Sequence, residues 1–135
     1  MGIYKDLEGE FDYEIVEEFL NHYSSMIGVM EKLIISLENP STFANKINEL
    51  FRMFHTIKSA SAYLKITPIH KIAVLAEEIL QECRELQGAA SEVLIEWFLL
   101  LHDQLNNYKT DLENDHENFS KLNKNIIKVP IEYLR

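Results

Sequence analysis

One stretch decides the fold of this chain: residues 41–64, which read STFANKINELFRMFHTIKSASAYL. Apolar or small residues recur there at alternating spacings of four and three: Phe43, Ile47, Leu50, Phe54, Ile57, Ser61 and Leu64. This spacing places them on one face of an α-helix, as a seam that packs against other helices. The stretch therefore predicts a long amphipathic helix.

Three other stretches show the same periodicity. The first follows Asp12, a predicted N-cap, and its apolar residues are Ile15, Phe19, Tyr23, Met26, Met30, Leu33 and Leu37. Another begins with Thr67 as N-cap and Pro68 at the first helical position, and continues with Ile69, Ile72, Ala76, Ile79, Cys83 and Leu86. The last opens near Ser91 and carries Leu94, Trp97, Phe98, Leu101, Leu105, Tyr108 and Leu112. Short breaks between four long helices predict an all-α, antiparallel up-down four-helix bundle over residues 12–113.

The two ends of the chain are short extensions of this bundle. Residues 1–11 are acidic, and they either form a short leading helix or fray. Residues 114–135 form a C-terminal tail, for which we expect a short helix near residues 116–122. An extended finish is expected after it, because Ile126, Ile127 and Val129 are β-branched and Pro130 follows them. This tail either packs on the bundle or mediates self-association, and the sequence does not distinguish between these alternatives.

Composition excludes several classes of function. The 135 residues suit a single domain, and the formal net charge of −9 disfavours a nucleic-acid partner. The one cysteine, Cys83, cannot form an intramolecular disulfide and is predicted to be a small core residue. No apolar run reaches the roughly 18 residues of a membrane span. The acidic start is unlike a signal peptide, so we expect a cytoplasmic protein without membrane insertion.

His55 stands apart from the apolar seam of its helix. A 100° rotation per residue turns it outward, beside Arg52, Lys58, Ser59 and Ala62. A neutral, exposed imidazole is a competent nucleophile near neutral pH. A neighbouring ammonium group would pair with an anion placed on the ring, so this surface is the candidate site.

The string around His55 resembles the signature of histidine-containing phosphotransfer (Hpt) domains. Residues 54–64 read FHTIKSASAYL, and the family pattern is a histidine, an aliphatic two positions on, a lysine, small residues, and an aliphatic nine positions on. These places are held by His55, Ile57, Lys58, Ser59, the small run 60–62, and Leu64. The stretch is especially similar to the phosphotransfer domain of chemotaxis-type histidine kinases.

The sequence departs from the family pattern in two places. Ser59 replaces a frequent glycine but is still small, so a phosphoryl group keeps its clearance. Lys65 replaces the glycine that commonly ends the helix. Helix termination should then depend on Thr67 and Pro68, because the residue before a proline is disfavoured in helical geometry.

The resemblance implies a role for each site residue. His55 would be phosphorylated, on Nε2, and Lys58 would stabilise the phosphoryl oxygens. An acidic residue on the next helix would hold Nδ1–H; counting along the resemblance gives Glu77, with Glu78 as the fallback. Partner docking is expected at residues near the histidine, namely Phe51, Arg52, Ala62 and Tyr63, although core packing is an equal alternative for Phe51.

The implied partners are a response-regulator receiver domain and a sensor histidine kinase. The chain has no nucleotide-binding or kinase motif, so the sequence predicts a phosphocarrier and not an enzyme. No cofactor of its own is expected, and Mg²⁺ would reside on the receiver domain. One alternative is a pseudo-Hpt or helical adaptor that binds partners without being phosphorylated. A metal enzyme is disfavoured because a di-iron bundle needs two Glu-x-x-His motifs, and only Glu113–His116 is present.

Overall fold

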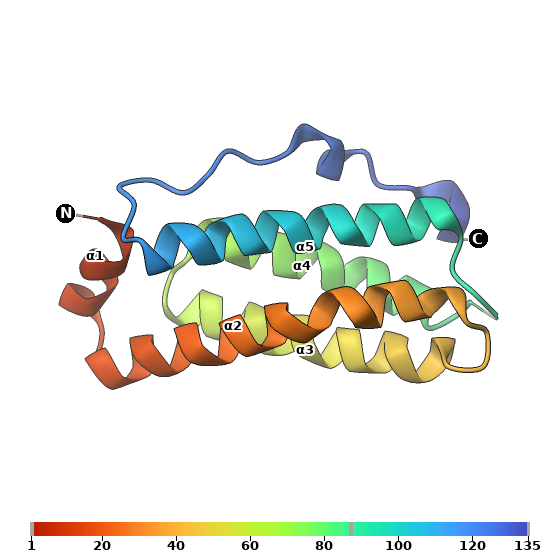
Figure 1. The fold of residues 1–135 in the computed structure, drawn as a ribbon, viewed down its shortest axis with the longest axis horizontal. Helices are drawn as coiled ribbons and strands as arrows, with labels where there is room; N and C mark the ends of the chain where they lie inside the picture. The colour runs from red at the N-terminus through yellow and green to blue at the C-terminus, as the bar shows by residue number, and fades with distance from the viewer. Residues whose placement is uncertain (1, 87, 135) are drawn as a thin grey trace.

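The computed structural model of the chain describes residues 2–86 and 88–134, and within them every regular element is helical. The elements are α1 (Ile3–Glu10), α2 (Tyr13–Ile35), η1 (Ser36–Glu38), α3 (Phe43–Tyr63), α4 (Thr67–Cys83), α5 (Glu92–Glu113), η2 (Lys124–Ile127) and η3 (Ile131–Leu134). The four long helices α2–α5 lie side by side, α1 crosses one end, and the segment after α5 returns along α5 (Figure 1). The prediction of an all-α helical bundle is confirmed at this level. Met1, Gln87 and Arg135, which fall in the predicted tails and in one predicted break, lie outside the described residues.

The core is built from the predicted seams, with one rotation. All seven seam residues of 43–64, which cover α3 and its C-cap, and all seven of α5 are buried. On α2 the prediction is wrong in part, because Ile15 is exposed and Leu33 only partly buried, while Val16, Ile27 and Ile34 are buried. Ile15 and Val16 are adjacent and differ by 100° around the helix, and packing against α3 and α5 selects the face that contains Val16.

Of the two predicted N-caps, Asp12 and Thr67, only Asp12 caps its helix, and Ser91, near which the last helix was expected to open, caps α5. Asp12 Oδ1 accepts a hydrogen bond from Glu14 N at 2.9 Å, and Ser91 Oγ accepts one from Leu94 N at 3.1 Å. The prediction for Thr67 is wrong: Thr67 is the first residue of α4, and the N-cap is Ile66, which makes no side-chain cap. Pro68 lies in the first turn, where the missing N–H costs nothing.

The end of α3 depends on Lys65, not only on Thr67 and Pro68 as predicted. Lys65 has φ 57°, the left-handed conformation that glycine adopts at many helix ends. Ile66 N donates to Ser61 O at 2.9 Å and Lys65 N to Ala62 O at 3.2 Å. These two bonds form a Schellman motif, so a lysine occupies the backbone geometry that the family usually gives to glycine.

Both ends of the chain pack on the bundle. Residues 3–10 form the short leading helix, whose first N–H groups are bound from outside it: Asp115 Oδ1 accepts from Tyr4 N and Lys5 N at 3.1 Å each. The predicted helix at 116–122 and the predicted extended finish are both wrong, since the structure has no helix over 116–122 and has η2 and η3 near the end. Side chains of α5 bind the backbone of this segment and replace the hydrogen bonds of a helix, as described below. No helix in the described part of the chain is both long and apolar enough to cross a membrane.

Candidate functional site

His55 lies on the outward side of α3 with 57% of its side chain exposed. Its Nδ1 is 3.1 Å from Oε2 of Glu77 on α4. A carboxylate only accepts hydrogen bonds, so Nδ1 carries the proton and donates it to Glu77. The lone pair is then on Nε2, and this nitrogen is the nucleophile that the site offers.

Glu77 faces α3 because of how α4 is rotated. Besides the predicted stripe, Ala73 and Leu80 are fully buried, and both lie within about 60° of Glu77 around the helix. Their burial turns the packed face of α4 towards Glu77, whose side chain is 18% exposed. The structure thus brings His55, Lys58 and Glu77 together, while Glu78, the fallback, is exposed.

The carboxylate of Glu77 accepts hydrogen bonds from two side chains of α3. Its Oε1 accepts a hydrogen bond from Lys58 Nζ at 2.8 Å, while Oε2 accepts from His55. Partial burial raises the pKa of Glu77, but the hydrogen bonds and charges of Lys58 and His55 outweigh it, and the net pKa is lowered. Glu77 is therefore ionised at neutral pH and can balance positive charge on the imidazole.

The His55 ring stacks on the Phe51 ring, which in turn contacts a guanidinium group. The Phe51 ring is stacked on the His55 ring, with centroids 6.4 Å apart and an interplanar angle of 11°. The Arg84 guanidinium lies 3.7 Å from the centre of the Phe51 ring, a cation–π contact. Arg84 Nε also donates to Asn48 Oδ1 at 3.1 Å. Sequence reasoning missed Arg84, and no motif would have found it, because the contact joins the end of α4 to α3.

The remaining predicted residues surround an open surface. Arg52, Ser59, Ala62 and Tyr63 are all exposed, and Phe51 is half-buried. Tyr63 also packs on Phe11, with ring centroids 5.7 Å apart. These positions are accessible to solvent, and their docking role stays a prediction.

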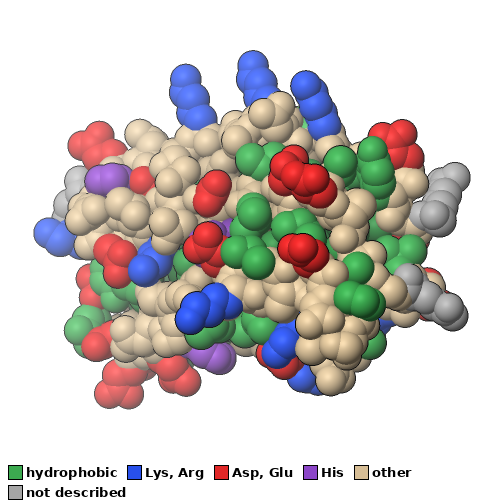
Figure 2. Space-filling model, turned by 45° about the vertical axis from the view of Figure 1, so that its right-hand side comes forward, with side chains coloured by type: hydrophobic (Ala, Val, Ile, Leu, Met, Phe, Trp, Pro, Cys, Tyr) green, Lys and Arg blue, Asp and Glu red, His purple; other side chains and the backbone are tan. Residues whose placement is uncertain are grey.

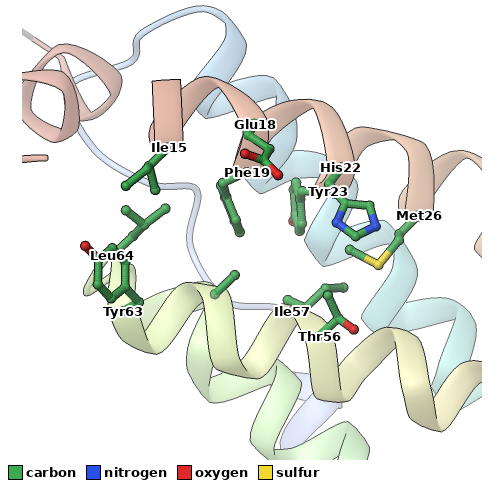
Figure 3. Close-up of a pocket in the computed structure, with 11 residues that line it drawn as sticks. Ile15, Glu18, Phe19, His22, Tyr23, Met26, Thr56, Ile57, Tyr63 and Leu64 are labelled. Carbon is green, nitrogen blue, oxygen red and sulfur yellow. The ribbon is translucent and has the colours of Figure 1, made fainter. Parts of the chain in front are cut away.

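A cavity of about 230 Å³ opens between α2 and α3 next to this surface. Figure 3 shows Glu18 and His22 of α2 on one side of it and Thr56 and Tyr63 of α3 on the other. Apolar side chains, including Ile15, Phe19, Ile57 and Leu64, complete its lining. Thr56 directly follows His55 in the chain, so the cavity adjoins the candidate site.

The structure also shows the surroundings of the candidate metal ligands and of the one cysteine. Within residues 2–86 and 88–134, no group of three or more His, Cys, Asp or Glu side chains could hold a metal ion. Cys83 is buried as predicted, and burial raises the pKa of its thiol to about 12. Its thiolate is therefore scarce at neutral pH.

Comparison with known proteins agrees with the geometry. The sequence profile of the Hpt domain matches residues 14–115, so the chain belongs to the Hpt domain family. It is similar to chemotaxis protein CheA of Klebsiella aerogenes (23% identical, covering 86% of this chain and 18% of that protein) and of Salmonella typhimurium (26%, covering 78% and 16%). CheA of Borreliella burgdorferi is 29% identical over 59% of this chain and 9% of its own length.

The chain thus spans less than a fifth of the length of the curated relatives it matches. No solved structure matches it closely enough to count as a relative. Membership of the Hpt family places the chain among the histidine phosphotransfer modules of phosphorelays.

Proposed function

We propose that His55 accepts a phosphoryl group on Nε2 and exchanges it with the aspartate of a response-regulator receiver domain. The observation that carries this proposal is the hydrogen bond from His55 Nδ1–H to Glu77, which leaves Nε2 unprotonated on an exposed face. The alternative nitrogen, Nδ1, is engaged and closer to the backbone. The arrangement therefore supports one site of phosphorylation.

The transfer needs few groups from this chain. The Nε2 lone pair attacks the phosphorus of an aspartyl phosphate, a P–N bond forms, and the P–O bond to the aspartate breaks; the reverse reaction returns the group. Nδ1 keeps its proton throughout, and Glu77 balances the positive charge of the phosphorylated ring. Phosphoryl transfer depends mainly on positioning and charge neutralisation, so a rigid helical carrier is sufficient.

Lys58 would supply the second charge. Its ammonium is bound to Glu77 in the unmodified domain, and it has three hydrogen-bond donors. It can therefore bond phosphoryl oxygens on the adjacent ring through a donor that Glu77 does not occupy. Ser59, one turn from His55, leaves clearance for the group.

The receiver domain would dock over the exposed residues around His55, with Arg52, Ala62 and Tyr63 as contacts and Phe51 at the edge. It would bring both the nucleophilic aspartate and Mg²⁺, and a sensor histidine kinase would be the source of the phosphoryl group. In this proposal residues 12–113 form an antiparallel up-down bundle and act as a phosphocarrier, not an enzyme. A cytoplasmic location stays a prediction.

The test is phosphoryl labelling by acetyl phosphate or by a phosphorylated receiver domain. We expect a label that is labile in acid and stable in base, which His55→Gln abolishes. His116→Gln is the matched control, because His116 is also exposed and bonded to a carboxylate, and it should label normally. Uptake of the same label by His55→Gln would disprove the proposal, whereas tight receiver binding without transfer would favour the adaptor.

A further inference from the structure

The segment 116–134 is anchored to α5 by three buried polar side chains spaced seven residues apart. Trp97 Nε1 donates to Ile126 O at 3.0 Å. Gln104 donates to Lys121 O at 3.2 Å and accepts from Asn123 N at 2.8 Å. Asp111 accepts from Ser120 N and Ser120 Oγ at 2.7 Å each. All three side chains are at most 4% exposed, so these hydrogen bonds are shielded from water while the segment is packed on α5.

This anchoring holds the backbone and leaves apolar side chains outside. Ile127 is 67% exposed and Ile131 is 55% exposed, and Leu122 and Tyr133 are also exposed. With Val93 of α5, they make up five of the ten large apolar residues that are exposed in the described part of the chain. Four of these ten residues lie on the 19 residues of the segment, which favours an interaction surface there.

A cavity of about 460 Å³ lies between α5 and this segment; we call it the outer groove. Its lining residues are Val93, Glu96, Trp97, Leu99, Leu100, Asp103, Asn125, Lys128 and Pro130. Figure 2 shows a row of basic side chains rising from the top edge of the molecule, along which the segment runs in Figure 1, with hydrophobic and acidic side chains gathered below. The groove thus has an apolar floor and charges of both signs.

The charges of the outer groove are available to a partner. Glu96 and Asp103 are exposed on α5, and Lys128 is exposed on the segment. Among residues 2–86 and 88–134, no ion pair of 4 Å or less joins Lys128 to either carboxylate. A surface that carries both signs side by side is complementary to a second copy of itself related by a twofold axis.

We propose that the outer groove is a twofold interface between two copies of this chain. In such a dimer, Lys128 of one copy faces Glu96 and Asp103 of its partner, and Ile127 and Ile131 are buried between them. The interface would lie on α5, whereas His55 is on α3, which packs chiefly on α4, α2 and η1. Both histidines would stay accessible, and the inference does not depend on phosphorylation.

Charge reversal tests this interface without disturbing the core. We expect sedimentation velocity of the 135-residue chain, from about 10 μM to 1 mM, to show a reversible monomer–dimer equilibrium. Lys128→Glu alone, and Glu96→Lys with Asp103→Lys, should each weaken dimerisation at least about tenfold, since like charges would then face each other. An equimolar mixture of the two variants restores both opposite-charge contacts and should dimerise as well as the unmodified chain.

Matched controls separate this effect from a change in net charge. Lys71→Glu, and Glu31→Lys with Glu82→Lys, alter exposed residues of other helices by the same charge and should leave the dimer unchanged. Ile127→Ser should weaken it without affecting phosphoryl labelling of His55. A chain that stays monomeric at the highest concentration, or a mixture that fails to restore association, overturns the proposal and leaves the groove to a different protein.

Discussion

Two histidine–carboxylate pairs in the molecule share one contact pattern but differ in their surroundings. His55 Nδ1 lies 3.1 Å from Glu77 on the α3–α4 face. His116 Nδ1 lies 2.7 Å from Asp111 where the chain leaves α5. Both rings are about half exposed, at 57% and 48%, and both carboxylates are largely covered, at 18% and 6%.

The second oxygen of each carboxylate makes the difference. Glu77 offers it to the Lys58 ammonium, whereas Asp111 offers it to the backbone and hydroxyl of Ser120. The first pair is therefore set between two helices beside the Lys58 ammonium, which in the proposed function would also bond a phosphoryl group. The second ties a loop to a helix. A histidine–carboxylate contact alone does not identify a reactive site; its remaining partners do.

Replacing the two carboxylates should separate these roles most strongly. In the proposed function Glu77→Gln removes the charge that balances the phosphorylated ring; loss of a comparable carboxylate partner of a metal-bound histidine costs roughly ten- to a hundredfold. We expect that decrease in the rate of phosphoryl transfer, measured by quenched time courses with a phosphorylated receiver. Asp111→Asn should transfer at the rate of the unmodified chain. Equal rates for all three proteins would contradict the roles assigned here.

For stability we expect the opposite order, with Asp111→Asn lowering the free energy of unfolding more than Glu77→Gln. Asp111→Asn leaves a buried site with too few acceptors for Ser120 and His116, which costs about 2 kcal/mol in the free energy of unfolding. Chemical denaturation measures this, with Glu113→Gln, exposed on the same helix, as the control expected to change stability by less than about 0.5 kcal/mol. Glu77→Gln should cost less than Asp111→Asn, because its ion pairs are more exposed.

At low pH, the contribution of Asp111 to the free energy of unfolding should be lost. Burial raises its pKa, but hydrogen bonds from Ser120 and the contact with His116 outweigh this, and the net pKa is lowered from its ordinary value of 3.8. A carboxyl group with a lowered pKa in the folded state stabilises the fold fully above its unfolded pKa, and this stabilisation is lost as pH falls through the folded pKa. The stability difference between the unmodified chain and Asp111→Asn should narrow below about pH 4. A stability difference that stays constant down to about pH 3 would contradict the lowered pKa of Asp111.

The smallest expected effect concerns two residues just after α3 and α5, Lys65 and Asp115. Both have a left-handed backbone conformation, with φ 57° and 50°. Lys65→Gly should stabilise the chain by about 1 kcal/mol, because glycine adopts this conformation without strain. Asp115→Gly relieves the same strain but removes the acceptor for Tyr4 N and Lys5 N, so we expect no gain. Thermal unfolding of both variants measures the difference; stabilisation by Asp115→Gly equal to that by Lys65→Gly would show that α1 does not need this cap.

The helices were predictable because their signal is local and periodic. The seams of α3 and α5 and the outward position of His55 follow from spacing along one helix, and the cap at Asp12 follows from its residue type just before the first turn. The errors arose where another part of the chain decides the outcome. The α2 face was selected by its neighbours, and residues 116–122 are not helical because α5 satisfies their backbone groups.

The sequence by itself determined the all-helical class and the family. It also placed His55 and Lys58 one turn apart on a solvent-facing surface, because helical periodicity fixes which residues share a face. Only the tertiary structure decided that Glu77 and not Glu78 meets the imidazole, that Arg84 covers Phe51, and that Trp97, Gln104 and Asp111 hold the last segment. These contacts join residues far apart in sequence. They depend on the rotation of one helix against another, which core packing sets and no single helix encodes.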